Sequence, residues 1–345
     1  MKRLILGTFA LVAALTVFFA VMWLLDNRVS NFEGPAELYV RPGDSPQSVI
    51  DSIAAQTKIK HPKRLERVFA NYELETQMQP GHYRIGGRAP SVYVARMLRH
   101  GWQTPVKLVL SGTLRRPCDI ARKISRQMMV DSATVMAAFA DEALLARLGA
   151  TSATLFSLFM PDTYEMYWTD SAEKILERQK KAVDAFWTPE NLALAAAQGL
   201  TRHEATVVAS IVKGESNYEP EFPKIAGVYL NRLDRGMKLQ ADPTVAYCHG
   251  YAMNRILLRH LTIDSPYNTY VYAGLPPGPI CVPTRACLEA VLHPDRGNGN
   301  LYFCADPSFN GTHRFAATYS EHLRNAGEFQ RALNKRAAEK KKAAV

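Results

Sequence analysis

The first pattern along the chain is a long apolar stretch that follows Lys2 and Arg3. Residues 4–25 are apolar apart from one glycine and two threonines. Roughly 22 residues at a helical rise of about 1.5 Å span about 33 Å, which is enough to cross the hydrocarbon core of a bilayer. A cleaved signal peptide has a shorter apolar region and small residues at its cleavage site, and neither feature is found before Asp26. We therefore expect an uncleaved single-span anchor at 4–25, with residues 1–3 in the cytoplasm and the rest of the chain outside it.

Short alternating elements follow the apolar stretch. Residues 26–37 are polar, contain a Gly-Pro pair, and are predicted to form a linker. The next elements are predicted to be a strand at 38–40, helices at 45–55 and 62–72, a turn followed by a strand within 80–85, and a helix at 91–100. This order predicts a small α+β module at 38–105, and the module contains no obvious catalytic group.

The remainder, 106–345, is predicted to be a larger α+β domain. A strand is expected at 106–110, and a hairpin is expected to pair 301–305 with 313–317. Between 237 and 283 the chain is rich in Pro, Gly, Tyr and Asn and shows little periodicity, which favours a long structured loop. Helical periodicity predicts helices at 119–129, 132–148, 170–187, 189–198, 201–216, 224–235, 286–292 and 320–341.

One of these helices, 201–216, carries a carboxylate on its apolar face. Thr201 with Glu204 three residues later forms a capping-box pattern, which predicts the start of the helix. At about 100° per residue, Glu215 projects roughly 20° from Val208 and 40° from Ile211, two residues of the apolar face. Burial there would disfavour the charged form and raise the pKa of Glu215, as a general acid requires. The alternative is a helix that ends one residue earlier, leaving Glu215 in solvent.

Charge, cysteine content and motifs limit the partners and cofactors that the chain is expected to bind. The net charge is +10. This charge can simply reflect a solvated basic surface, or it can serve to attract the protein to an anionic polymer or membrane surface. Nucleic acid is a poor candidate partner for an exported domain. The five cysteines lie well apart and their odd number leaves at least one thiol free. No zinc, P-loop or dinucleotide motif is present, so we expect no metal and no cofactor.

A second carboxylate is harder to find. Most glycosidases need two, and Asp242 is the nearest candidate, although an Asp before Pro commonly forms a turn. Glu219 and Glu221 flank Pro220 and are expected to be exposed. His313, on the predicted hairpin, is a candidate for facing the site.

Five segments carry a resemblance to a known family. In order they read ASIVKGES, GVYLNRL, GMKLQADPTVAY, SPYNTYVYAGLPPGPI and LYFCAD…GTHRF. In order and spacing they resemble the signature blocks of the endolytic murein transglycosylase (YceG-like) family, with MPDTY and PGHYRI resembling weaker blocks. The resemblance implies a single-pass inner-membrane protein with a LysM-like module at about 38–105 and a periplasmic catalytic domain after it.

The resemblance also implies a reaction. The family cleaves within peptidoglycan glycan strands, between N-acetylmuramic acid and N-acetylglucosamine, and leaves 1,6-anhydro ends that stop glycan elongation. The sugar's own C6 hydroxyl is the nucleophile, so one carboxyl can serve first as acid and then as base. Peptidoglycan synthases are implied as partners of the enzyme.

The family's catalytic Glu falls on Glu215. Where the family usually has Glu-Lys-Glu-Thr, this chain has Lys213 at the first position and Ser216 at the fourth. Lys213 would lower the pKa of Glu215 if it approached, but at a spacing of two residues the side chains point apart. The family's Gly-Gly-His block is also altered, to Asn-Gly-Thr-His with extra residues before it. The candidate substrate contacts are Gln240, Asp242, Asn268, Tyr270 and His313.

Two other interpretations remain open. One is a hydrolase (muramidase) that acts on the same strands and uses Asp242 to hold a water. The other is a catalytically silent, membrane-anchored scaffold whose small module binds the cell wall.

Overall fold

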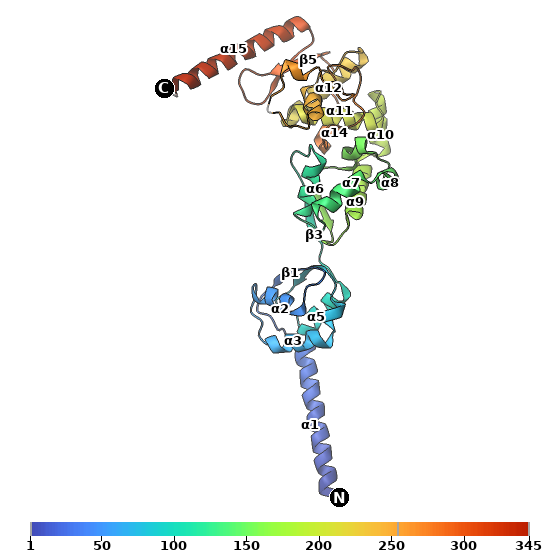
Figure 1. The fold of residues 1–345 in the computed structure, drawn as a ribbon, viewed down its shortest axis with the longest axis vertical. Helices are drawn as coiled ribbons and strands as arrows, with labels where there is room; N and C mark the ends of the chain where they lie inside the picture. The colour runs from blue at the N-terminus through green and yellow to red at the C-terminus, as the bar shows by residue number, and fades with distance from the viewer. Residues whose placement is uncertain (1, 254, 344–345) are drawn as a thin grey trace. The chain divides into compact units, whose positions relative to one another are not determined.

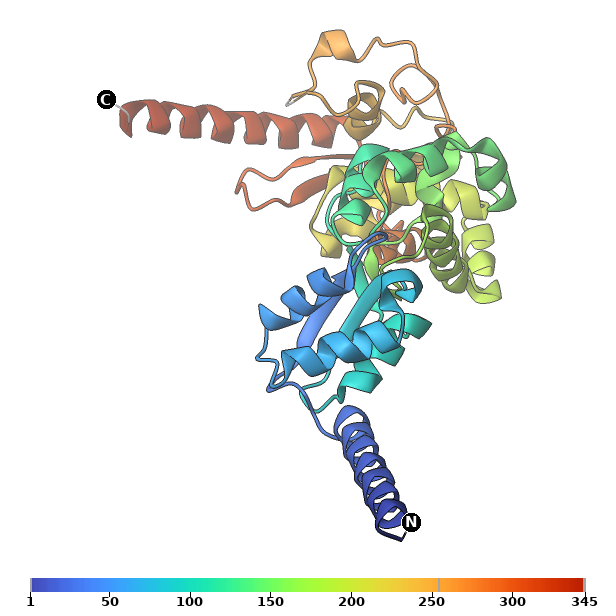
Figure 2. The same cartoon turned by 60° about the horizontal axis from the view of Figure 1, so that its bottom comes forward.

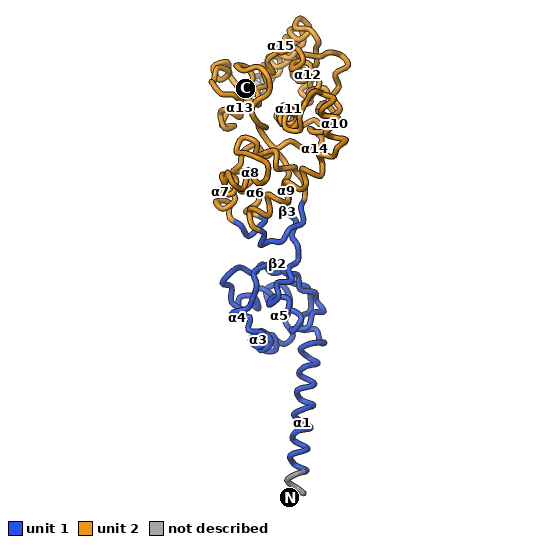
Figure 3. Tube along the Cα trace, turned by 90° about the vertical axis from the view of Figure 1, so that its right-hand side faces the viewer, with its two compact units in different colours: residues 1–108, 127–130, 164–170 blue, residues 109–126, 131–163, 171–345 orange. Residues whose placement is uncertain are grey.

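The computed structural model describes residues 2–253 and 255–343. The chain divides into two compact units, coloured separately in Figure 3. Unit 1 comprises residues 1–108, 127–130 and 164–170, and unit 2 comprises 109–126, 131–163 and 171–345. The predicted α+β class is confirmed in both units.

Helix α1, Lys2–Asn27, contains the apolar stretch. Its segment Leu6–Asn27 is 22 residues long and apolar enough to cross a membrane, and a signal sequence would also meet this test. The large side chains of this segment are solvent-exposed, unlike those of a core helix, with Phe9 74% exposed. Helix α1 is therefore an apolar N-terminal helix that does not belong to the core of either unit.

Unit 1 packs helices against a two-stranded antiparallel sheet (Figure 1). Strand β1 alternates buried and exposed residues and pairs with β2 so that Leu38 faces Tyr83, and both residues are buried in the core. The elements are β1 (Ala36–Val40), α2 (Pro46–Ala54), α3 (Pro62–Asn71), α4 (Leu74–Gln77), β2 (Gly81–Ile85) and α5 (Ser91–His100). Within 26–37, Asn31 and Phe32 are also buried.

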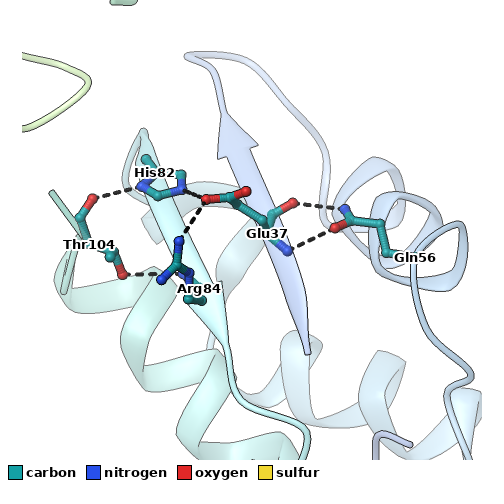
Figure 4. A network of polar contacts seen from close by, with 5 residues as sticks. All are labelled: Glu37, Gln56, His82, Arg84 and Thr104. Atoms are coloured by element: carbon teal, nitrogen blue, oxygen red, sulfur yellow. Dashed lines mark hydrogen bonds and ion pairs between the residues drawn. The ribbon is translucent and has the colours of Figure 1, made fainter. Parts of the chain in front are cut away.

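A buried histidine joins the sheet of unit 1 to the segment that follows α5 (Figure 4). His82 is 2% exposed; its Nδ1 lies 2.8 Å from the carbonyl of Thr104 and its Nε2 lies 2.7 Å from Oε1 of Glu37. The two ring nitrogens of His82 thus connect β2 to Thr104 through its carbonyl and to Glu37 of β1 through its carboxylate. The hydrogen bond from His82 lowers the pKa of Glu37.

Unit 2 is largely helical and contains the strand pair β5–β6, while β3 pairs with β4. Strands β3 and β4 begin or end in unit 1. The elements are β3 (Val106–Leu110), α6 (Pro117–Ser125), α7 (Ser132–Ala140), α8 (Glu142–Arg147), the 3-10 helix η1 (Ser152–Leu158), β4 (Asp162–Met166), α9 (Ala172–Phe186), α10 (Pro189–Ala197), α11 (Arg202–Glu215), η2 (Glu219–Glu221), α12 (Phe222–Asp234), α13 (Asp242–Cys248), η3 (Leu258–His260), α14 (Arg285–Leu292), β5 (Tyr302–Ala305), β6 (His313–Ala316) and α15 (Tyr319–Ala343).

Helix α11 lies at the centre of the core of unit 2, packed against α12, α13 and α14. Every residue from 205 to 212 is buried, so the helix is covered on all sides rather than along one stripe. Ser210 is accommodated because its hydroxyl donates to the carbonyl of Val207 and accepts from the amide of Ile280. A helix held in this way is a rigid support for the residues at its C-terminal end.

Two predicted elements were wrong. The single helix expected at 132–148 is two helices, α7 and α8, because Asp141 adopts an extended conformation and its side chain caps α8 by accepting from the amide of Leu144 at 3.0 Å. The stretch 237–283 was expected to be irregular, but it contains α13, which begins at Asp242 with Pro243 in its first turn. Proline suits this position because its missing N–H would have no partner there.

Candidate active site

The capping box predicted for α11 is present. The amide of Thr201 donates to Oε2 of Glu204 at 2.8 Å, and the amide of Glu204 donates to Oγ1 of Thr201 at 3.2 Å. The helix then runs through Glu215, which is its last residue and is partly buried. The alternative, in which the helix ends earlier and Glu215 extends into solvent, is therefore wrong.

Gly214 allows α11 to approach α13 directly. A Cβ atom added to Gly214 would lie 2.6 Å from Cβ of Pro243 and 3.4 Å from Cδ1 of Ile280. The first of these distances is too short for two carbon atoms, so a larger residue would push the two helices apart. This close approach places the end of α11 beside the start of α13, where Asp242 lies.

The carboxyl of Glu215 has a single direct partner among the described side chains, the phenol of Tyr229 on α12. The Tyr229 hydroxyl donates to Oε1 of Glu215 at 2.5 Å. Tyr229 is 2% exposed and its ring packs edge-on against Phe303. Burial raises the pKa of Tyr229 well above its ordinary value, so the phenol stays protonated and remains a donor.

Burial raises the pKa of Glu215 to about 7. Loss of hydration is the largest cause, since it disfavours the charged carboxylate. The hydrogen bond from Tyr229 and the charge of Arg232 act in the opposite direction, while the negative charge of Asp242 adds to the rise. A carboxyl with this pKa is populated in both forms near neutral pH, which is what a group that must both give and take a proton requires.

Arg232, also on α12, is a buried cation near this carboxyl. It is 8% exposed, and its Nε donates to the carbonyl of Leu301 at 2.6 Å. One terminal nitrogen donates to the carbonyl of Leu239 at 2.8 Å, and the guanidinium lies 5.3 Å from the centre of the Tyr302 ring. These partners are uncharged, so the positive charge is available to act on Glu215.

The predicted contacts Asp242 and Tyr270 lie together in the structure. The Tyr270 hydroxyl donates to Oδ1 of Asp242 at 2.6 Å, and Asp242 is exposed. Burial raises the pKa of Tyr270, and the charges of Asp242 and Glu215 raise it further. The negative charges of Asp242 and Glu215 thus both act on Tyr270, and that of Asp242 also acts on Glu215.

The other two predicted contacts in the 237–283 stretch have different surroundings. Asn268 is fully buried. Its side-chain NH2 group donates to the carbonyls of Leu261 and Ile263, and its side-chain oxygen accepts from the backbone amide of Tyr270. Asn268 thus holds the loop that carries Tyr270. Gln240 is exposed, has a left-handed backbone with φ 49°, and its amide donates to the carbonyl of Thr269.

A cleft of 660 Å³ opens in front of Glu215. One side is the end of α11, and the other is the loop between β5 and β6 together with α15, which lies beside this hairpin in Figure 2. The lining residues are Gly214, Glu215, Ser216, Asn217, Tyr218, Ala305, Asp306, Phe309, Asn310, Gly311, Thr312, His313, Phe329 and Arg336. A cleft open to solvent on a helical scaffold suits a long, polar substrate.

His313 lines this cleft and is held by Glu221. Its Nδ1 lies 2.9 Å from Oε2 of Glu221, and its backbone amide donates to Oε1 of the same carboxylate at 2.9 Å. Glu221 is only 8% exposed, so the expectation that it would be solvated was wrong. This carboxylate fixes the ring of His313 and the start of β6 at once.

Lys213, the departure noted in the sequence, makes its contact elsewhere. Its Nζ donates to Oδ1 of Asn217 at 2.8 Å. The charges that shift the pKa of Glu215 are those of Asp242 and Arg232, whereas the charge of Lys213 acts on Cys281 and Cys287. Within 2–253 and 255–343, no group of three or more His, Cys, Asp and Glu side chains could hold a metal ion.

Tyr229, Arg232 and Glu221 are the site residues that sequence reasoning missed. Tyr229 has the helical spacing of the apolar face of the helix predicted at 224–235. A buried phenol needs a hydrogen-bond partner, so its presence on that face was a usable signal. For Arg232 and Glu221 no such signal existed, because charged residues near a helix end or a proline are usually exposed.

Comparison with known proteins decides the family. Residues 38–328 match the model of the YceG-like family. The chain belongs to this family. In a 120-residue segment it is 44% identical to the endolytic murein transglycosylase of Bacillus subtilis, covering 35% of this chain and 32% of that protein.

Longer matches cover most of this YceG-like chain. It is 24% identical over 344 residues to the endolytic murein transglycosylase of Streptococcus pneumoniae strain D39, covering 90% of this chain and 62% of that protein. The chain thus spans less than two thirds of the length of these relatives. A crystal structure of a YceG-like protein from Listeria monocytogenes is 26% identical, with a TM-score of 0.55, and covers 85% of this chain and 99% of that one.

Proposed function

We propose that this chain is an endolytic murein transglycosylase that cleaves glycan strands of peptidoglycan with Glu215 as its only acid/base. The observation that carries the proposal is the carboxyl of Glu215, whose pKa is raised to about 7 at the edge of an open cleft. Membership of the YceG-like family and the names of its relatives give the substrate class.

One carboxyl suffices for this reaction because the substrate supplies the nucleophile. Protonated Glu215 gives its proton to the glycosidic oxygen as the bond from C1 of N-acetylmuramic acid to that oxygen breaks. The resulting carboxylate takes the proton of the C6 hydroxyl of the same sugar as O6 bonds to C1. The products are a free hydroxyl on one fragment and a 1,6-anhydro ring on the other, no water is consumed, and Glu215 returns to its protonated form.

The neighbouring residues position and tune this group. Tyr229 holds Oε1, which leaves Oε2 as the oxygen that exchanges the proton. Asp242 favours the protonated form of Glu215 by charge repulsion, and Arg232 limits the rise in pKa. We assign Asp242, Tyr270 and His313 to substrate binding beside the reacting bond, with Gln240 at the exposed edge and Asn268 as a support for Tyr270.

The rest of the chain would place this site at the cell wall. We propose that 4–25 is an uncleaved anchor in the inner membrane, with 1–3 in the cytoplasm and the remaining residues in the periplasm. We assign β1 and β2, with α2, α3 and α4 between them, to a LysM-like module at 38–105 that is joined through 26–37 to the anchor, and 106–345 to the catalytic domain.

Product masses test the proposal. The full chain in detergent is incubated with uncrosslinked glycan strands, and the fragments are analysed by mass spectrometry. The proposal predicts fragments that are lighter by one water than those with reducing ends. Reducing ends would instead support the hydrolase in which Asp242 holds a water, and binding without any cleavage would support the silent scaffold.

A further inference from the structure

Helices α3 and α5 form an outer face of unit 1 at the end where α1 leaves it (Figure 1). The two helices pack against each other, and α1 contacts α5. We call this the basic face, because α3, α5 and the turn before α3 carry Lys60, Lys63, Arg64, Arg67, Arg96 and Arg99, of which Lys60, Lys63 and Arg96 are exposed and the others half-buried.

The end of α1 is fastened to this face. Arg67 on α3 binds both carboxylate oxygens of Asp26, at 2.8 and 2.9 Å, and Asp26 is only 8% exposed. Arg64, one turn earlier on α3, donates to the carbonyl of Leu25 at 3.4 Å. The last turn of α1 is therefore held by two arginines of the same helix.

The chain just after α1 is fixed as well. The side-chain amide of Asn31 donates to the carbonyl of His61 and to the hydroxyl of Ser91, at the starts of α3 and α5. Its oxygen accepts from the amide of His61, and Asn31 is fully buried. Hydrogen bonds thus join both the last turn of α1 and the chain just after it to the helices of the basic face.

The six cations of this face outnumber its three carboxylates, which are Asp26, Glu66 and Glu73. Asp26 forms an ion pair with Arg67, and Glu73 forms one with Arg99 at 3.4 Å. Lys60 and Lys63 are exposed and have no carboxylate partner within the described residues. Arg96 donates to the hydroxyl of Tyr72, which is uncharged.

Exposed aromatic rings adjoin these cations. Tyr93 on α5 and Trp102 just after it are each 49% exposed, and their ring centres lie 6.1 Å apart. Tyrosine and tryptophan are enriched at the level of lipid headgroups, where one part of the ring system is wet and the other is apolar. Cations and aromatic rings together are the side chains that an anionic membrane surface attracts.

We infer that the basic face rests on the anionic headgroups of the membrane that α1 enters. This inference depends on the proposed anchor, because an α1 that spans the bilayer brings α3 and α5 to the lipid surface. Since α1 is fastened to this face, the face meets the headgroups whenever the helix is inserted. The contact would hold the small module flat against the membrane and would weaken as salt screens the charges.

Hydroxyl-radical footprinting of the full chain in lipid nanodiscs tests the inference. Nanodiscs of phosphatidylcholine alone are compared with nanodiscs that also contain phosphatidylglycerol. We expect anionic lipid to slow the oxidation of Tyr93 and Trp102 by about threefold or more, and high salt to reverse the effect. Tyr39 is the internal control, because it is 50% exposed and lies on β1, at the opposite end of unit 1 from α1 (Figure 1).

Charge reversal gives a second readout. Replacing both Lys60→Glu and Lys63→Glu changes two exposed side chains and should abolish the protection of Tyr93 and Trp102 by anionic lipid. Lys107→Glu, an exposed lysine of β3, should leave the protection unchanged.

Three results would overturn the inference, and they separate it from the proposed anchor. If the chain is retained in the nanodisc but Tyr93 and Trp102 are oxidised equally in both lipids, the proposed contact between the basic face and the headgroups is refuted, while the proposed anchor is not. Protection that requires added glycan strands instead of anionic lipid assigns the face to the cell wall. A chain that is not retained in the nanodisc at all refutes the anchor and the inference together.

Discussion

The hydroxyl of Tyr229 lies 2.5 Å from Oε1 of Glu215, and both groups sit where α11 and α12 pack in the core of unit 2. Tyr229 stabilises the charged carboxylate, whereas burial destabilises it, and burial is the stronger effect. The carboxyl therefore remains protonated to about pH 7 while its orientation is fixed.

The first prediction concerns the pH dependence of the wild-type enzyme. Because Glu215 must begin the reaction protonated, kcat/KM should be level in mild acid and fall about tenfold per pH unit above the pKa of about 7. The measurement is the rate of strand cleavage across that range at constant ionic strength. A rate that falls already above pH 5 would mean that Glu215 has the pKa of an ordinary carboxyl.

Tyr229→Phe should change both the rate and its pH profile. Removing the phenol removes a hydrogen bond that lowers the pKa of Glu215, so the descending limb should move to higher pH. The loss of orientation should reduce kcat about tenfold. Tyr218→Phe is the matched control, because Tyr218 lines the same cleft and is 46% exposed. A Tyr229→Phe profile that coincides with wild type would show that the contact does not tune Glu215.

Asp242→Asn should move the profile in the opposite direction. The substitution removes a negative charge that raises the pKa of Glu215, and the amide oxygen of Asn can still accept from Tyr270. The descending limb should therefore move to lower pH while turnover in mild acid stays within about tenfold of wild type. Complete loss of turnover at every pH would instead indicate that Asp242 takes part in the reaction, as the hydrolase interpretation requires.

Gly214→Ala should destabilise the protein. Alanine normally stabilises a helix relative to glycine by about 1 kcal/mol, but here its Cβ would lie 2.6 Å from Pro243. Overpacking of this kind costs about 1–3 kcal/mol, so the net effect should be a lower free energy of unfolding. Gly327→Ala on α15 is the control, since the nearest atom to its Cβ lies 3.6 Å away, and it should be neutral or stabilising. Denaturant unfolding of the three proteins measures both effects.

Local signals in the sequence predicted much of the support for this site. The capping box at Thr201, the apolar periodicity of α11 and the hairpin of β5 and β6 each follow from neighbouring residues, and each is present. The position of Glu215 on a buried face also followed from helical geometry.

The contacts that tune Glu215 could not be predicted in the same way. Tyr229 meets Glu215 only because α12 packs on α11, and α13 was missed because Asp242-Pro243 also suits a turn. Glu221 and His313 are 92 residues apart, and nothing near either residue indicates the pairing. Such contacts arise from tertiary packing, which local patterns do not encode.

The most direct test of the account is the rate of strand cleavage by Glu215→Gln, which keeps the shape of the side chain but cannot exchange a proton. We predict a loss of about 10²–10⁴-fold or more in kcat. Folding should be preserved: the wild-type carboxyl favours the folded state when protonated, and that contribution is lost as pH rises from 4.5 to about 7. The variant should therefore be more stable than wild type at pH 8, by up to about 3 kcal/mol, and similar to it near pH 4. Near-normal cleavage by this folded variant would contradict the assignment of Glu215 as the acid/base.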